Sequence, residues 1–307
     1  MILSWLKRFI FAIAFMAICM PLFANAKQID SASIQTSLEK LEASSGGRLG
    51  IYAINTSNNM HIQYRAKELF PFCSTGKIMV VAAILEESEK NPALLQKKIT
   101  YSQKDVDESG YAPIAKQHID RGMSIAELCK AAIEYSDNTA MNLLLKVVGG
   151  PKAITSFARS IHNNTFRLDR WEPDLNTAIP GDTRDTTTPE AMANSLRHLA
   201  LGDILSVPQR EQLKTWMKNN TTGDKKIRAG VPTDWIVGDK TGNGQYGTTN
   251  DIGIIWPSKC APIVIAIYLT QNKKDAVKRE DIIASATRMA LNELATTDQC
   301  IKQSYLY

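Results

Sequence analysis

Hydrophobic residues recur along this 307-residue chain with two different periods, and the order of those periods predicts the architecture. A helical period over residues 29–44 precedes two short strand-like runs at 48–55 and 60–65. Turn-forming residues at 56–59 separate these runs, which predicts a hairpin. Helical periods then dominate the middle of the chain. The predicted helices there cover residues 78–89, 124–135, 140–148, 151–161, 189–201 and 207–219.

Strand-like runs return near the end of the chain, at residues 234–239, 251–256 and 263–270, before a final amphipathic helix at about 275–294. Because strands at both ends surround a helical middle, we expect an α/β (α+β) fold with one five-stranded antiparallel sheet flanked by helices. The expected sheet domain comprises residues 27–67 and 220–307, and the inserted all-helical domain residues 68–219. A ligand cleft is expected where the two meet.

The first 26 residues have the pattern of a signal peptide. Lys7 and Arg8 precede an apolar run at residues 9–18, and Ala24-Asn25-Ala26 is a small-x-small cleavage pattern. The apolar run is shorter than the roughly 20 residues that a membrane span needs, although an N-terminal anchor is the alternative. We therefore expect a periplasmic or secreted protein without stable membrane association.

The composition excludes several other classes of protein. The chain is 44% hydrophobic and 22% charged, as is usual for a globular protein. The net charge of +5 falls to +3 when the leader with Lys7 and Arg8 is removed, and so small a charge, without interleaved aromatic and basic residues, argues against nucleic-acid binding. The histidines are scattered and the cysteine spacing fits no zinc pattern, so we expect no metal or cofactor.

The first candidate for chemistry is Ser74-Thr75-Gly76-Lys77. At a helix start, Lys77 lies one turn beyond Ser74, and its amine can accept the serine proton if burial lowers its pKa. Free N–H groups at the helix start suit a developing oxyanion. The same spacing occurs at Ser37 and Lys40, in a helix predicted to be solvated. We favour the Ser74 copy because the apolar run at 78–85 follows it.

The second candidate is Ser136-Asp137-Asn138, just after a predicted helix. The Ser136 hydroxyl can pass a proton to a leaving nitrogen, and the Asn138 amide can hold a substrate carbonyl. Serine, aspartate and asparagine are also favoured N-cap residues, so a plain helix cap is the alternative interpretation.

Two further motifs follow. Lys240 and Thr241 together suit a carboxylate, and Gly242 allows close approach of a substrate. A turn with a surface lysine is the alternative there. Glu172 lies in a polar loop. It is either an exposed surface residue or a general base that holds a water with the help of Asn176.

In order, the motifs S-x-x-K, S-D-N, E-x-x-L-N and K-T-G have lead residues separated by 62, 36 and 68 positions. This pattern resembles that of class A β-lactamases over essentially the whole mature chain. The resemblance implies the fold shared by serine β-lactamases and D,D-peptidases. It also implies hydrolysis of the β-lactam amide through an acyl-enzyme on Ser74, and hence antibiotic resistance.

The resemblance also implies roles for individual side chains. Ser136 would protonate the departing ring nitrogen, and Glu172 with Asn176 would activate the water that hydrolyses the ester. Either Lys77 or Glu172 would be the base in acylation. The backbone N–H groups of Ser74 and of the residue after Gly242 would hold the oxyanion.

The substrate itself would be a small-molecule β-lactam bound by a monomer. The residues implied to contact it are Tyr111, Asn138, Asn176, Lys240, Thr241, Asn243 and Lys226. Of these, Lys226 stands where some relatives have an arginine for the substrate carboxylate. A lysine there supplies a point charge but not the bidentate guanidinium fork.

Other implied features are structural. Arg170 and Asp185 match a pair that braces the loop around Glu172, and the Glu172–Pro173 peptide matches one that is cis in the family. Glu172 also favours a β-lactamase over a D,D-peptidase, which shares the other motifs but lacks a deacylation base. A non-catalytic binding protein on the same fold is the remaining alternative.

The four cysteines of the mature chain differ in what they imply. Some class A carbapenemases pair the cysteine before the nucleophile with one two residues beyond K-T-G, where this chain has Gly244. Cys129 matches half of another family disulfide, whose second half is Val81 here. Cys260 begins the last strand, and Cys300 follows the helix that returns antiparallel to it. We therefore expect a Cys260–Cys300 disulfide.

Overall fold

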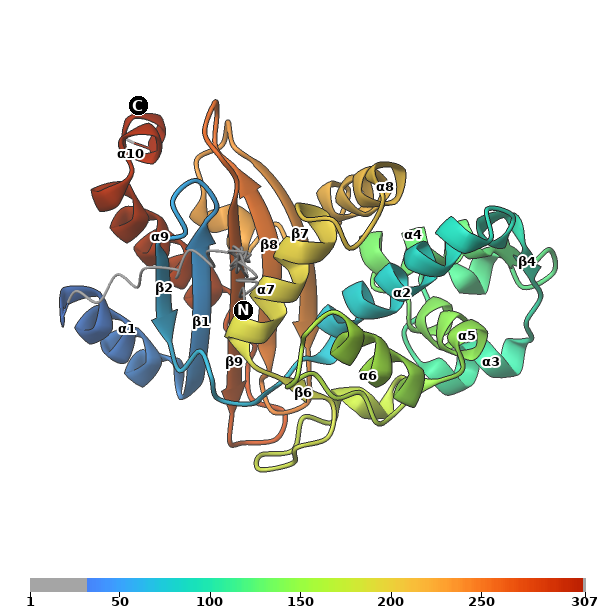
Figure 1. Cartoon of the computed structure of the whole chain (residues 1–307). Coiled ribbons are helices and arrows are strands. Elements are labelled where there is room, and N and C mark those ends of the chain that lie inside the picture. Colours follow the sequence, from blue (N-terminus) through green and yellow to red (C-terminus); the bar gives the residue numbers. More distant parts are fainter. Residues whose placement is uncertain (1–31, 306–307) are drawn as a thin grey trace, which may run out of the picture.

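The computed structural model describes residues 32–305, and a five-stranded antiparallel sheet stands at its centre (Figure 1). Its strand order is β2-β1-β9-β8-β7. The strands are β1 (Gly47–Asn55), β2 (His61–Tyr64), β7 (Ile236–Asn243), β8 (Thr249–Trp256) and β9 (Ile263–Gln271). Pairing of β1 with β9 joins the N-terminal hairpin to the C-terminal strands, which confirms the sheet expected from both chain ends. The leader expected at residues 1–26 lies outside the described residues.

The three inner strands, β1, β9 and β8, are buried on both faces, and their alternate side chains supply two separate cores. In β1, Ile51 and Ala53 belong to the core under α1 (Ala32–Ser45) and α9 (Glu280–Thr297). Tyr52 and Ile54 belong to the core on the opposite face. This is the two-residue period of a strand, and it explains the run of β-branched and aliphatic residues in β9.

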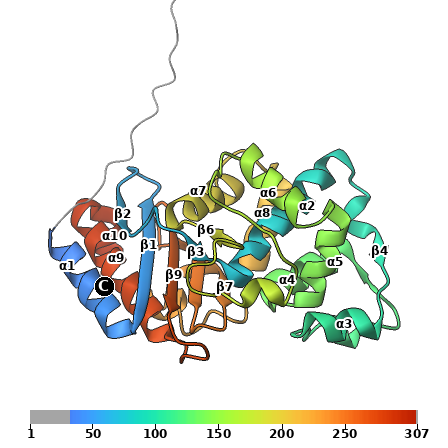
Figure 2. The same cartoon turned by 90° about the horizontal axis from the view of Figure 1, so that it is seen from below.

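Helices cover both faces of the sheet (Figures 1 and 2). One face is covered by α1, α9 and the short α10 (Gln299–Tyr305). The other is contacted by α7 (Pro189–Ala200), which packs on β1 and β9 although it comes from the middle of the chain.

The remaining helices gather beyond the β7 edge of the sheet, around α2 (Lys77–Lys90). Residues 77–85 of α2 are all buried, and α2 contacts α4, α5, α6 and α8. The surrounding helices are α3 (Gln103–Ser109), α4 (Ile125–Glu134), α5 (Asn138–Val148), α6 (Pro151–Ser160) and α8 (Val207–Lys218). The predicted apolar helix after Lys77 is therefore the centre of this helical layer.

Some boundaries differ from the sequence expectation. The strand predicted at 234–239 is β7, which begins at Ile236 and continues to Asn243. It extends this far because Asn243 pairs with Thr249, the first residue of β8. The last long helix begins at Glu280 instead of about residue 275, where Asp275 has a positive φ of 58°. Helix α3 was not predicted, since its sequence is polar and only Val106 and Ser109 are buried.

Short elements complete the chain, and none of them was predicted as an element of its own. They include two-residue strand pairs and single 3-10 turns, which have too few residues to show a hydrophobic period. They are β3 (Phe70–Pro71), β4 (Lys98–Ile99), β5 (Met123–Ser124), β6 (Thr186–Thr187), η1 (Cys73–Gly76), η2 (Leu94–Gln96), η3 (Ala115–Gln117), η4 (Asp174–Asn176) and η5 (Ile227–Gly230).

The expected Cys260–Cys300 disulfide is present, and it ties the segment before β9 to α10. Cys73 and Cys129 are free thiols, and both are buried. Among residues 32–305, no helix combines the length and the apolar character needed to span a bilayer.

Candidate active site

Ser74 lies in the 3-10 turn η1, which leads directly into α2. Cys73, just before it, has a positive φ of 50°, so the chain turns sharply into the serine. Thr75 secures the turn, since both its backbone N–H (3.2 Å) and its hydroxyl (2.8 Å) donate to the Phe72 carbonyl. The expected helix start at Ser74 is thus a tighter turn, and the α-helix itself begins at Lys77.

Gly242 of β7 lies against this turn. A Cβ atom at Gly242 would come within 2.7 Å of the Phe72 carbonyl oxygen. Only a residue without a side chain allows β7 to approach η1 this closely. The glycine of the K-T-G motif therefore brings the strand beside the serine.

Lys77 is fully buried and joins three of the predicted motifs. Its Nζ donates to Ser74 Oγ (3.1 Å), to the Ser136 carbonyl (2.7 Å) and to Asn138 Oδ1 (2.7 Å). It also forms an ion pair with Glu172 Oε1 at 3.0 Å. A buried amine without access to solvent is stabilised by such a set of acceptors and by the carboxylate.

Ser136 has its hydroxyl between two lysines. Lys240 Nζ donates to Ser136 Oγ at 2.9 Å and to the Thr241 carbonyl at 2.9 Å, while Lys77 Nζ is 3.4 Å from the same hydroxyl. Burial, and then the positive charges of Lys77 and Lys226, lower the pKa of Lys240 well below its ordinary value. The hydroxyl of Ser136 can therefore exchange a proton with either amine.

Within Ser136-Asp137-Asn138, the helix cap is Asp137 alone, and the side chains of Ser136 and Asn138 contact Lys77. Asp137 is the N-cap of α5, where its Oδ1 accepts from the Ala140 N–H at 2.9 Å. Asn138 starts the helix and turns its side chain to the cavity beside Ser74. Its Nδ2 donates to the Ser109 carbonyl at 3.0 Å, while Oδ1 accepts from Lys77.

Glu172 is fully buried in the loop before η4, and its peptide bond to Pro173 is cis, as expected. Asn176 Nδ2 donates to Glu172 Oε2. The Asn142 amide makes two bonds to the backbone of Glu172, each 2.9 Å, accepting from its N–H and donating to its carbonyl. Asn142 was not predicted, although it lies four residues after Asn138 on the same face of α5.

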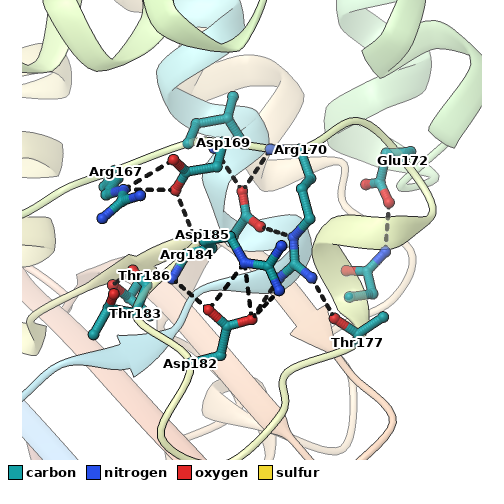
Figure 3. A network of polar contacts seen from close by, with 12 residues as sticks. Arg167, Asp169, Arg170, Glu172, Thr177, Asp182, Thr183, Arg184, Asp185 and Thr186 are labelled. Carbon is teal, nitrogen blue, oxygen red and sulfur yellow. Dashed lines mark hydrogen bonds and ion pairs between the residues drawn. The ribbon is translucent and has the colours of Figure 1, made fainter.

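The loop that carries Glu172 is braced by the expected Arg170–Asp185 ion pair (Figure 3). Asp185 is fully buried and also accepts from the backbone N–H groups of Asp169 (2.8 Å) and Arg170 (3.0 Å). Arg170 donates to Thr177 Oγ1 at 2.8 Å and lies 3.7 Å from Asp182. These bonds hold the two ends of the loop together around the glutamate.

A cavity of about 300 Å³ opens above Ser74. Tyr111 lies at its mouth, with 57% of its surface exposed. The lining residues are Ser74, Tyr111, Ser136, Asn138, Asn176, Thr222, Thr241, Gly242, Asn243 and Lys278. Thr222, whose hydroxyl is 2.6 Å from that of Thr241, and the exposed Lys278 were not predicted. Neither belongs to a motif, so no pattern in the sequence indicated them.

Lys226 does not line this cavity. It is fully buried, and its Nζ donates to Asn243 Oδ1 at 3.2 Å and to the Asn250 carbonyl at 3.0 Å. Asn243 therefore stands between Lys226 and the cavity.

Gly244 lies beside Cys73, the residue that precedes Ser74. A Cβ atom at Gly244 would be 2.9 Å from Cys73 Sγ, so the two positions are adjacent although only one carries sulfur. Within residues 32–305, no group of three or more His, Cys, Asp or Glu side chains is arranged to hold a metal ion.

Comparison with known proteins agrees with this geometry. The family model of the β-lactamase enzyme family matches residues 33–294. A β-lactamase of Proteus vulgaris is 54% identical over 267 residues, which cover 87% of this chain and 98% of the relative. β-Lactamase Toho-1 of Escherichia coli is 54% identical over 257 residues, covering 84% and 88% of the two chains.

Solved structures give the same result. A variant of the class A β-lactamase of the last common ancestor of Gram-negative bacteria has a TM-score of 0.84 and 50% identity, and covers 87% of this chain and 100% of its own. A β-lactamase of Desulfarculus baarsii has a TM-score of 0.84 and 47% identity, with 87% and 98% covered. The chain belongs to the family of class A serine β-lactamases, the enzymes that hydrolyse β-lactam antibiotics.

Proposed function

We propose that Ser74 is the nucleophile that opens the β-lactam ring and that Glu172 is the base that releases the product. One observation carries this proposal: Lys77 Nζ lies 3.1 Å from Oγ of Ser74, which lines the cavity, and 3.0 Å from Glu172 Oε1. The serine hydroxyl is thus connected through one amine to a buried carboxylate. Nucleophile and base within hydrogen-bond reach are the signature of covalent catalysis.

In acylation, a bond forms between Ser74 Oγ and the lactam carbonyl carbon, and the carbon–nitrogen bond of the ring breaks. The serine proton passes to Lys77 or, through it, to Glu172. Ser136 gives its proton to the departing nitrogen and recovers one from a neighbouring lysine. The distances of 2.9 Å from Lys240 Nζ and 3.4 Å from Lys77 Nζ to its hydroxyl support that role. The backbone N–H groups of Ser74 and Asn243 hold the oxyanion.

In deacylation, Glu172 removes a proton from a water molecule that attacks the ester carbon, and Ser74 Oγ leaves with a proton. Asn176, which donates to Glu172 Oε2, holds the carboxylate and the attacking water in place. Burial without solvent access strengthens the electrostatic interactions of this carboxylate. A D,D-peptidase, without such a base, would stall at the β-lactam acyl-enzyme.

We propose that the substrate carboxylate binds beside Lys240 and Thr241, near the wall of the cavity formed by β7. Asn138 binds the acylamino group through the second N–H of its amide, since the first is donated to Ser109. Tyr111, exposed at the mouth, packs against the substrate side chain.

We further propose that residues 27–67 and 220–307 form a sheet domain and residues 68–219 a helical domain, with α7 as the element that packs on the sheet. The cavity residues come from both parts, which supports this division. A periplasmic or secreted location is supported by the Cys260–Cys300 disulfide, because disulfides persist in oxidising compartments. We expect a monomer.

Nitrocefin turnover by the wild type and by Glu172→Ala tests the proposal. The wild type should turn over many equivalents, and Glu172→Ala should release one equivalent rapidly and then slow by about 10²- to 10⁴-fold. A wild type that reacts once and stalls would show a D,D-peptidase-like enzyme. Normal turnover by Glu172→Ala would show that another group is the deacylation base.

A further inference from the structure

Lys226 is buried at the start of η5, and yet its amine makes a direct contact with a residue of the active-site cavity. Its Nζ donates to Asn243 Oδ1 at 3.2 Å and to the carbonyl of Asn250 at 3.0 Å. Lys226 has no exposed surface, whereas Asn243 is half-buried and lines the cavity above Ser74. Whatever Lys226 does to a substrate must therefore act through Asn243.

The chemistry of the contact fixes the orientation of the Asn243 amide. The Lys226 amine donates hydrogen bonds, and an amide accepts them only through its oxygen. The amide atom of Asn243 that faces Lys226 is therefore Oδ1. The nitrogen, Nδ2, then points the opposite way. Within residues 32–305, Nδ2 of Asn243 makes no hydrogen bond, and it is not among the buried polar atoms that lack a partner. Its two N–H groups are available to a molecule in the cavity.

Strand β7 places a second donor beside this amide. Thr241 and Asn243 are two residues apart in the strand, so their side chains project from the same face, and both line the cavity. The Thr241 hydroxyl and the Asn243 Nδ2 therefore form a row of two groups facing the substrate. Lys240, whose amine donates to the Thr241 carbonyl, places a buried amine at the same edge of the strand.

We propose that Lys226 is a positioning residue that turns the Asn243 amide so that its NH₂ group donates to the substrate carboxylate beside Thr241. This inference rests on the proposed binding of that carboxylate along β7. Without Lys226 the Asn243 amide can rotate by 180°, which would present an oxygen to the negative charge. The consequence is on substrate affinity, because neither side chain makes a hydrogen bond to Ser74, Lys77 or Glu172, and rotating the Asn243 amide leaves its backbone N–H in place.

Steady-state kinetics with benzylpenicillin test this coupling in four proteins: the wild type, Lys226→Met, Asn243→Ala and the double variant. Lys226→Met should raise KM by about tenfold, the value of one hydrogen bond to a charged group, and change kcat less than twofold. In the Asn243→Ala background, the same lysine substitution should leave KM unchanged. Lys226→Arg, which keeps a donor toward the amide, should restore KM to within about threefold of the wild type.

Asn243→Asp separates orientation from folding. It keeps an oxygen facing Lys226 and replaces the substrate-facing NH₂ with a second oxygen of the same size. KM should rise by at least tenfold while the Tm is maintained. Lys90→Met is the matched control, since Lys90 is an exposed lysine at the end of α2, and it should leave KM and Tm unchanged.

Two results would overturn the inference. One is that Lys226→Met raises KM by the same factor with and without the Asn243 side chain. The other is that Lys226→Met lowers kcat and Tm at unchanged KM, which is the mark of a purely structural lysine. Failure of the proposed catalytic function would appear separately, as a wild type that does not turn over benzylpenicillin.

Discussion

Lys77 and Glu172 form an ion pair of 3.0 Å in which neither side chain is exposed to solvent. Ser74 Oγ lies 3.1 Å from the same lysine amine, so both candidate bases of the acylation step belong to one buried network. Removing either partner leaves an uncompensated buried charge, which lowers the free energy of unfolding as well as the activity. Substitutions of residues that contact this pair therefore separate an effect on catalysis from an effect on stability better than substitutions of Lys77 or Glu172 themselves.

Asn142 offers such a substitution. Its amide makes two hydrogen bonds to the backbone of Glu172, so Asn142→Ala should let the glutamate shift without removing its charge. We expect deacylation to slow by about ten- to a hundredfold, since each bond contributes about 1 kcal/mol, while acylation changes less. Stopped-flow traces with nitrocefin should then show a burst that the wild type lacks. Equal slowing of both steps would contradict this role.

Asp185 should be essential for the loop that carries Glu172. It is fully buried, pairs with Arg170 and accepts two backbone N–H groups. Asp185→Ala should lower the free energy of unfolding by about 3–5 kcal/mol, the range for a broken buried pair. Asp182→Ala is the comparison: this less buried carboxylate pairs with Arg184 and lies 3.7 Å from Arg170, so its loss should lower the free energy of unfolding much less than the loss of Asp185. Urea denaturation measures both, and equal losses would refute the assignment.

The Cys260–Cys300 disulfide should stabilise the fold without affecting catalysis. It closes a segment with a sequence separation of 40, for which the chain-entropy relation gives about 4 kcal/mol. The double variant Cys260→Ser/Cys300→Ser should therefore unfold at lower urea, while kcat/KM for nitrocefin stays within twofold. Non-reducing peptide mapping must first find the bridge in the wild type, and free thiols at both positions would disprove it.

Asp105 should make stability depend on acid pH. A hydrogen bond from Lys146, and then bonds from Ser102, lower the pKa of Asp105 to about 2 in the folded protein. Its contribution is thus complete above the unfolded pKa of about 4 and is lost as the pH falls through about 2. Asp105→Asn should lower the free energy of unfolding by up to about 1 kcal/mol at pH 7, and the difference from wild type should vanish near pH 2.

Asp107→Asn is the control for that experiment, because it removes one negative charge from the same helix α3 without touching Lys146. Free energies of unfolding at pH 7, 4 and 2.5 compare the three proteins. A difference between Asp105→Asn and the wild type that persists unchanged at pH 2.5 would contradict the assigned ion pair.

The architecture was readable from the sequence because long elements carry strong periods. Ile51 and Ile54 of β1 belong to the two different cores, and this alternation follows from the two-residue period of a strand. The continuous apolar run after Lys77 likewise predicts a buried helix. The order of four motifs then indicated which serine, lysine and glutamate come together. That conjunction excluded the equally spaced Ser37 and Lys40 in α1, of which Ser37 is half-buried and Lys40 exposed.

What the sequence did not reveal depends on contacts between distant segments. Lys226 was expected to meet the substrate, yet its amine meets Asn243, because the packing of η5 behind β7 is a tertiary relationship. Lys278 reaches the cavity from the irregular segment before α9, whose start was predicted about five residues too early. Thr222 belongs to no motif, and only the fold brings its hydroxyl within hydrogen-bond distance of the Thr241 hydroxyl in the cavity.

The mass of the intact protein after mixing with benzylpenicillin tests the central claim most directly. Glu172→Ala should gain the full mass of one penicillin molecule and keep it for minutes, and peptide mapping should locate the adduct on Ser74. Ser74→Ala should gain nothing, while the wild type should return to its free mass once the substrate is exhausted. An adduct on another residue, or no adduct on Glu172→Ala despite continued hydrolysis, would contradict the assignment of Ser74 as nucleophile and Glu172 as deacylation base.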